Sequence, residues 1–212
     1  MRVEILTSTP EIESQMQIVE RAGRVCYQSY KEPVTIYTAR KFIAMLIKRG
    51  HESVLEHGSI TVLFGGVSRG MTHELVRHRV GVAYSQESTR YVDEQAAQFA
   101  LPPRLENSPR ARELMTQALG AYRELRALGV TKEDARQFLP IGMENQIVVT
   151  ANFRAWRHII AQRTARAAHW EIRQALVRLV EQLRPIVSPV FDEFIFDTVC
   201  ASGVPFSCFS KV

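Results

Sequence analysis

The side chains best suited to chemistry are concentrated between Glu74 and Tyr91. Residues 77–90 contain three arginines, one histidine and four uncharged hydrogen-bonding residues, which are Arg77, His78, Arg79, Ser85, Gln86, Ser88, Thr89 and Arg90. Guanidinium groups bind phosphates and carboxylates through paired hydrogen bonds, and the hydroxyl and backbone donors of a loop can complete an anion site. The stretch therefore predicts a phosphate-bearing ligand, held where a helix passes into a loop.

A second set of polar residues falls in the segment 151–184, which has no glycine or proline and predicts one long helix or two adjacent helices. The first half of this segment has one apolar stripe, formed by Trp156, Ile159, Ile160 and Ala167. Arg163 falls within that stripe, and an arginine facing the core needs an acceptor because an unpaired buried charge is costly. Its partner is either a ligand or a structural ion pair. Arg154 and His158 share the opposite face.

The helix expected at residues 69–79 leads into the arginine-rich stretch. Residues 65–72 imitate a phosphate-binding P-loop, but Met71 stands where that motif requires lysine. Within the helix, Glu74 precedes Arg77 by three residues and His78 by four, so the three side chains share one face. They form either an ordinary surface ion pair or part of the ligand site.

No metal-binding pattern is expected in this chain. His51 and His57 stand six residues apart, whereas two zinc ligands on one helical face stand four apart; the polar residues 51–57 either line a pocket or form a solvated turn. Cys26, Cys200 and Cys208 have neither zinc-binding nor disulfide spacing. With no signal peptide, we expect a cytoplasmic location. The apolar runs are too short for a membrane span, so no membrane partner is expected.

Length and composition narrow the class of protein. With 212 residues, 46% of them hydrophobic and 23% charged, the chain predicts one globular domain, residues 1–212. Of its 27 basic residues 22 are arginines, which favours phosphate ligands, nucleic acid or charged subunit interfaces; a coding bias is the alternative explanation. Aromatic residues do not interleave with the basic ones as a stacking platform requires, so we do not expect nucleic acid as the partner.

The elements that must position these groups follow from periodicity and from helix-starting and helix-ending residues. Strands are expected at residues 3–6, 58–67 and 146–150, and helices at 9–26, 36–49, 69–79, 109–128 and 132–139, besides 151–184. Residues 80–83 are expected to form a loop of small side chains. The helix at 109–128 carries an apolar stripe assigned to the core, which consists of Leu114, Met115, Ala118, Tyr122 and Leu125.

Four blocks in this order resemble the flavin-dependent thymidylate synthases. They are residues 50–53 with 56–57; Arg77, His78 and Arg79 with Ser88, Arg90 and Tyr91; residues 135–140; and Asn152, Arg154, His158 and Arg163 with residues 170–173. Together they cover most of the chain from about residue 20 to 175. The family usually has seven residues between the Arg-His-Arg triplet and the serine, whereas residues 80–87 make eight here. We place the additional residue among Gly81, Val82 and Ala83.

The resemblance implies an α/β fold with a mixed or antiparallel twisted sheet flanked by helices, in a homotetramer whose active sites are shared between subunits. It implies FAD-dependent methylation of dUMP to dTMP, with the carbon from 5,10-methylenetetrahydrofolate and NADPH as the reductant of the flavin. FAD binding in this family does not use a Rossmann motif, in agreement with the lack of GxGxxG in the sequence.

The resemblance also implies roles for individual residues. FAD would contact His51, Ser53, Arg77, His78, Arg79, Gln86, Asn152, Arg154 and His158. The nucleotide dUMP would contact Glu74, Arg77, Gln86, Ser88, Thr89, Arg90, Arg136 and Arg163. Arg163 is the expected catalytic residue, because its guanidinium would stabilise negative charge on the uracil ring, to which reduced flavin delivers hydride.

Alternatives remain open at this point. Ser88 is assigned to phosphate binding rather than to nucleophilic attack, because no GxSxG elbow surrounds it. An arginine-rich nucleic-acid-binding protein is a second hypothesis, and it predicts binding that weakens steeply with salt. A flavin- or nucleotide-binding homologue without turnover is a third, since the longer spacer could have abolished catalysis.

Overall fold

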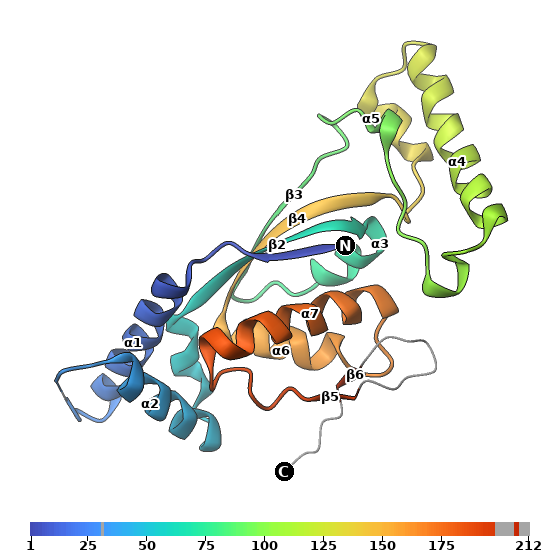
Figure 1. The fold of residues 1–212 in the computed structure, drawn as a ribbon. Coiled ribbons are helices and arrows are strands. Elements are labelled where there is room, and N and C mark those ends of the chain that lie inside the picture. Colours follow the sequence, from blue (N-terminus) through green and yellow to red (C-terminus); the bar gives the residue numbers. More distant parts are fainter. Residues whose placement is uncertain (31, 198–205, 208–212) are drawn as a thin grey trace.

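The computed structural model describes residues 1–30, 32–197 and 206–207. Figure 1 shows a body, in which helices lie beneath a sheet and at one end of it, and an arm that projects from the other end of the sheet. In chain order the elements of the body are β1 (Arg2–Ile5), α1 (Thr9–Cys26), α2 (Ile36–Lys48), the 3-10 helix η1 (Glu52–His57), β2 (Ser59–Ser68), α3 (Arg69–Leu75), β3 (Val82–Gln86), β4 (Glu144–Asn152), α6 (Phe153–Arg163) and α7 (Trp170–Val187). The arm contains η2 (Glu94–Ala96), η3 (Pro103–Leu105), α4 (Pro109–Ala127), α5 (Lys132–Ala135) and η4 (Arg136–Phe138). A two-residue pair, β5 (Phe196–Asp197) and β6 (Phe206–Ser207), follows.

The main sheet has the order β1-β2-β4-β3, and all its neighbouring strands are antiparallel. The expected α/β fold with an antiparallel sheet is therefore confirmed. The two central strands pair along their length, from Ser59 opposite Asn152 to Ser68 opposite Glu144. Alternation on β2 is as expected, with Ile60, Val62 and Phe64 fully buried.

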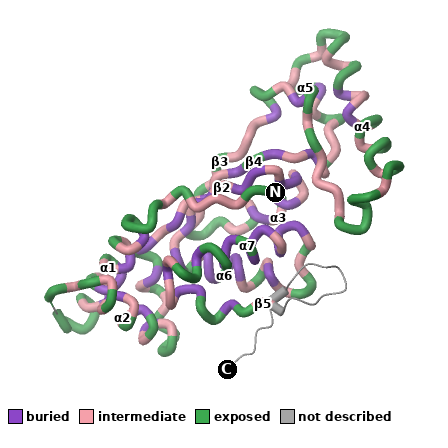
Figure 2. The backbone as a smooth tube through the Cα atoms, viewed as in Figure 1, coloured by how far each residue is buried: buried purple, intermediate pink, exposed green. Residues whose placement is uncertain are grey.

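The core lies largely between the sheet and helices α6 and α7, which run beneath it in Figure 1, and Figure 2 colours parts of these elements as buried. Trp156 of α6 is completely buried and its Nε1 donates to the carbonyl oxygen of Ile60, 3.0 Å away. The tryptophan thus links α6 to the sheet through both packing and a hydrogen bond. Ile159 and Ile160 are fully buried too, as expected from the apolar stripe.

The arm has a small cluster of its own, formed by Leu119, Tyr122 and Ala135. The core assignment of the α4 stripe holds for Tyr122, but it is wrong for Leu114, which is 48% exposed. The physical reason is that α4 packs against short arm segments rather than against the sheet, so only part of its apolar face is covered.

The segment 69–86 differs from the prediction in two places. The helix expected at 69–79 ends at Leu75, because the hydroxyl of Tyr84 donates to the carbonyls of Leu75 and His78, each 2.7 Å away. Residues 82–86, expected as a loop and a polar run, form β3.

The segment 151–184 forms two helices after β4 has continued to Asn152, with a connecting segment at 164–169. This segment begins at Thr164, whose side-chain hydroxyl donates to the Ile160 carbonyl 2.7 Å away. Ala167 lies in it and is exposed, so its assignment to the apolar stripe is wrong. Within the described part of the chain, no helix has the length and hydropathy needed to cross a membrane. Cys200 and Cys208 lie outside the described residues.

Candidate active site

Arg163, the last residue of α6, is held at three points by the end of α3 and the turn after it. Its Nη1 donates to Glu74 Oε2 at 2.9 Å, its Nη2 to the Glu74 carbonyl oxygen at 3.1 Å, and its Nε to His78 Nε2 at 3.0 Å. The Arg163 side chain is 21% exposed and that of Glu74 31%. An arginine on the apolar stripe of α6 was expected to need a hydrogen-bond acceptor, and Glu74 and His78 provide it within the chain. These bonds use three of the five guanidinium N–H groups, which leaves one on each Nη for a ligand.

His78 is neutral in this arrangement, because the ring nitrogen that accepts from Arg163 cannot carry a proton. Burial, followed by the nearby Arg163 and His158, lowers the pKa of His78 to about 4. The rings of His78 and His158 lie edge to face with 5.7 Å between their centroids. At neutral pH the imidazole is thus an uncharged acceptor that orients the arginine.

The turn that carries His78 is fixed by two residues. Tyr84 binds two carbonyls of the turn, and burial raises the pKa of its hydroxyl to about 12. Gly81 has φ of +70°, and a Cβ on it would clash with Asn152 Nδ2. Its carbonyl oxygen accepts from the Asn152 backbone N–H at 3.1 Å. Only glycine suits this position, so the small-residue segment brings the arginine-rich turn against the start of α6.

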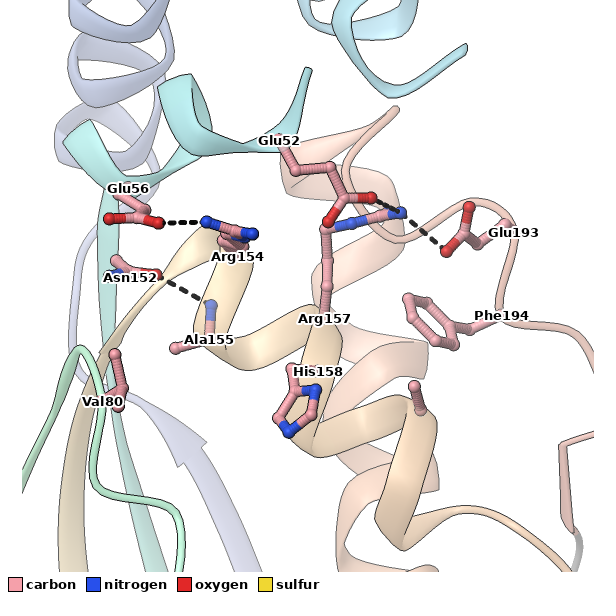
Figure 3. A pocket seen from close by; sticks show the side chains of 11 residues that line it. Glu52, Glu56, Val80, Asn152, Arg154, Ala155, Arg157, His158, Glu193 and Phe194 are labelled. Carbon is pink, nitrogen blue, oxygen red and sulfur yellow. Dashed lines mark hydrogen bonds and ion pairs between the residues drawn. The ribbon is translucent and has the colours of Figure 1, made fainter. Parts of the chain in front are cut away.

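A cavity of about 540 Å³ lies beside this turn (Figure 3). Asn152 caps α6 by accepting from the Ala155 N–H at 2.8 Å, and His158 follows on the same helix. Arg154 pairs with Glu56 of η1 at 2.6 Å, and both side chains are about half exposed. The cavity therefore presents one accessible guanidinium, an amide and an imidazole from the start of a single helix.

A second cavity of about 420 Å³ adjoins the first, since Val80, Ala155 and His158 line both. Together the two cavities bring the following predicted residues into one group, the body cluster: Arg77, His78, Arg79, Asn152, Arg154, His158 and Arg163. The volumes fall in the range of small-molecule sites. Arg77 and Arg79 are exposed.

Four of the predicted nucleotide contacts form a separate group, the arm-side cluster, made of Ser88, Thr89, Arg90 and Arg136. Nη1 of Arg136 donates to Thr89 Oγ1 at 3.5 Å, and the Arg90 backbone N–H donates to Ser88 Oγ at 3.3 Å. Arg90 also pairs with Glu133 at 2.9 Å. Arg136 begins η4 in the arm, away from α6 in Figure 1, so one chain does not bring this cluster to Arg163.

Three predicted contacts lie elsewhere. Gln86, at the far end of β3 from Gly81, donates to Thr72 Oγ1 at 2.9 Å and to Asn145 Oδ1 at 2.8 Å. His51 is exposed and its Nδ1 lies 3.3 Å from the Tyr27 hydroxyl. Ser53 of η1 is also exposed.

The sequence did not point to two arginines that the structure makes prominent. Arg157 is 6% exposed, lines the larger cavity, and binds Glu52 at 3.0 Å and Glu193 at 2.8 Å (Figure 3). Arg69 donates to the Glu87 carbonyl at 2.8 Å, just before Ser88. Burial lowers the pKa of Arg69, and nearby Arg136 lowers it further, against Glu94 and Glu87, which raise it. No local pattern in the sequence singled out either arginine, because Arg157 lies at the edge of the apolar stripe of α6 rather than within it.

The donor set suits an organic anion rather than a metal. In the described part of the chain, no three His, Cys, Asp or Glu side chains are grouped as a metal site requires. The two cavities instead present guanidinium, imidazole and amide donors, which match phosphate oxygens and ring carbonyls. The three glutamates that also line the larger cavity, Glu52, Glu56 and Glu193, are paired with Arg157 or Arg154. A phosphorylated, ring-bearing cofactor fits this chemistry.

Comparison with known proteins points the same way. Residues 5–189 match the family described as "Thymidylate synthase complementing protein". The chain is 39% identical over 202 residues to a protein of Mycobacterium tuberculosis named "Flavin-dependent thymidylate synthase", covering 86% of this chain and 80% of the relative. Proteins of the same name from Mycolicibacterium vanbaalenii and Mycobacterium marinum are 39% identical over 197 residues and 38% identical over 202 residues. These cover 84% and 86% of this chain, and 78% and 80% of the relatives.

Proposed function

This chain belongs to the thymidylate synthase complementing protein family, and on that premise we propose that it is a flavin-dependent thymidylate synthase that converts dUMP to dTMP. The observation that carries the proposal is the orientation of Arg163. Glu74 and His78 fix its guanidinium, and two N–H groups remain for a ligand.

Arg163 activates the uracil ring in this proposal. Its two remaining N–H groups match a uracil carbonyl and the adjacent N3, which becomes a hydrogen-bond acceptor when it loses its proton. Negative charge developing on the ring is then stabilised by a cation that is already oriented, so little reorganisation is needed during the reaction. The uncharged His78 leaves the positive charge of Arg163 unopposed, whereas the Glu74 carboxylate offsets part of that charge.

The arm-side cluster binds the dUMP phosphate. Arg136 and Arg90 supply the charge, and Ser88 and Thr89 supply hydroxyl donors. Arg69 supports this assignment, because its guanidinium lies near Arg136, and its Nε has no hydrogen-bond partner among the described residues. Two neighbouring guanidinium groups favour an anion between them.

The body cluster binds FAD, whose chemistry when bound is hydride transfer. Arg154 is the proposed pyrophosphate contact. Exchanging its exposed ion pair with Glu56 for a phosphate costs little, since pairs this exposed contribute at most about 1 kcal/mol. Asn152 and His158 line the same cavity, and Arg77, His78 and Arg79 line the adjoining one. NADPH as reductant and 5,10-methylenetetrahydrofolate as carbon donor complete the proposed reaction.

A homotetramer with shared active sites is part of the proposal. The body cluster and the arm-side cluster occupy different parts of one chain, and a nucleotide that touches both needs them together. We infer that the arm-side cluster of one subunit completes the body cluster of another.

The test is a reaction assay on the purified, flavin-loaded protein. We expect visible flavin absorption bands and release of tritium from 5-tritiated dUMP that requires both NADPH and methylenetetrahydrofolate. Colourless protein that takes up no FAD would refute the proposal. Protein that binds FAD and dUMP but releases no tritium would be a homologue without turnover. The eight-residue spacer at 80–87 would then be the first feature to alter.

A further inference from the structure

We propose that Glu171 is a positioning residue for Arg163: it fixes the start of α3, and the end of α3 fixes the guanidinium. This inference rests on the proposed function and extends it to a residue that touches neither FAD nor dUMP in that account. On this inference, the rate of the reaction depends on the buried contact between α3 and α7.

Glu171 is a buried carboxylate whose two oxygens, within the described part of the chain, both bind Ser68. It is 1% exposed in the first turn of α7, and its Oε1 accepts from the Ser68 backbone N–H at 2.7 Å. Its Oε2 accepts from the Ser68 hydroxyl. Ser68 is 5% exposed, and its Oγ in turn accepts from the Met71 N–H at 3.0 Å, which caps α3. A charge-assisted pair of this kind fixes its partner more tightly than neutral hydrogen bonds do.

Helix α3 is short, so the position of its first turn also determines the position of its last turn. It has seven residues, which corresponds to a length of about 10 Å. Ser68 caps its first turn, and Glu74 in its last turn binds Arg163 through both its side chain and its backbone carbonyl. Met71, Thr72 and Leu75 on the same helix are fully buried, so α3 is also packed against the body between its two ends.

The two contacts lie on either side of one connecting segment. Arg163 is the last residue of α6, and Glu171 is the second residue of α7, with residues 164–169 between the helices. That segment is itself tied down, since Nη1 of Arg173 donates to the Arg166 carbonyl at 2.9 Å. The contacts thus form a closed path. Glu171 binds Ser68 at the start of α3, Glu74 at the end of α3 binds Arg163, and the connecting segment joins Arg163 to Glu171. Loosening the Glu171 end shifts the Glu74 end relative to Arg163.

The experiment measures dUMP turnover by the flavin-loaded protein with Glu171→Gln, which keeps shape and removes charge. The expected result is about a tenfold fall in kcat, the size of one charge-assisted hydrogen bond. FAD content stays at the wild-type level and the KM for dUMP changes less than about twofold, because the phosphate contacts lie elsewhere. Glu181→Gln, at an exposed position of the same helix, is the matched control and keeps the wild-type kcat.

A double-mutant cycle separates positioning from general loosening. In the Glu74→Gln background the Glu171→Gln change costs about threefold or less, because one of the two links from α3 to the guanidinium is already weakened. The same loss in both backgrounds, an unchanged kcat, or a parallel loss of FAD overturns the inference. Where Glu171→Gln protein does not fold, Ser68→Ala replaces it; a fall in kcat with FAD retained supports the inference, and an unchanged kcat overturns it. Wild-type protein without turnover refutes the proposed function itself.

Discussion

Replacing Glu74 with glutamine tests how much of the activity depends on the orientation of Arg163. The change keeps the size of the side chain but removes the charge that faces Nη1 at 2.9 Å. The bonds from Arg163 to the Glu74 carbonyl and to His78 remain, so only one of the three anchors of the guanidinium is weakened.

The size of the expected loss follows from how exposed the ion pair between Glu74 and Arg163 is. With side chains 21% and 31% exposed, it lies between exposed ion pairs, which contribute about 0–1 kcal/mol, and hydrogen bonds to charged groups, which contribute about 1.5–3 kcal/mol. A loss of about 1.5 kcal/mol corresponds to roughly a tenfold lower kcat/KM for dUMP.

The assay is tritium release at saturating FAD, NADPH and folate, with dUMP varied. Glu113→Gln is the matched control, because Glu113 pairs with Arg110 at 2.8 Å on the exposed face of α4, and its loss changes nothing in the active site. Full activity in Glu74→Gln, or an equal loss in the control, would contradict a role for Glu74 in orienting Arg163.

Three further predictions follow from the same geometry. Arg163→Ala abolishes tritium release while FAD stays bound, as absorption spectra of the purified variant will record; loss of flavin instead contradicts the assigned role. Because the folded pKa of His78 is about 4 against 6.5 for the free group, the folded state binds fewer protons between these values. The free energy of unfolding therefore falls as pH drops from 6.5 to 4 and this contribution is complete above 6.5; urea unfolding across this range tests it, and His78→Gln, which cannot titrate, lacks this part of the slope. Gly81→Ala destabilises the fold by at least about 1–2 kcal/mol, because φ is +70° and the new Cβ meets Asn152. Gly120→Ala in α4, where a Cβ meets nothing within 4 Å, stabilises it by about 0.5–1 kcal/mol, and equal effects of the two in urea unfolding would contradict this account.

Local patterns sufficed for several features of the fold. The alternation of Ile60, Val62 and Phe64 and the phase of Trp156 and Ile159 each reflect burial on one face, which periodicity reports directly. The same phase showed that Arg163 needed an acceptor, and Glu74 and His78 provide it.

Other features depend on contacts between distant residues and left no local signal. Helix α3 ends at Leu75 because Tyr84, nine residues later, takes its carbonyl. Helices α6 and α7 separate without glycine or proline, so no residue type marks the break. The separation of the arm-side cluster from Arg163 was also not visible, because the order of motifs along the chain does not say how far apart the fold places them.

The most direct measurement is a crystal structure of the assembled protein with FAD and dUMP bound. We expect that Arg163 keeps its bonds to Glu74 and His78 and places its two remaining N–H groups on the uracil ring. Arg136 and Ser88, from another subunit, should hold the phosphate. A uracil ring bound away from Arg163, or a nucleotide phosphate on Arg154 instead of Arg136, would contradict the account.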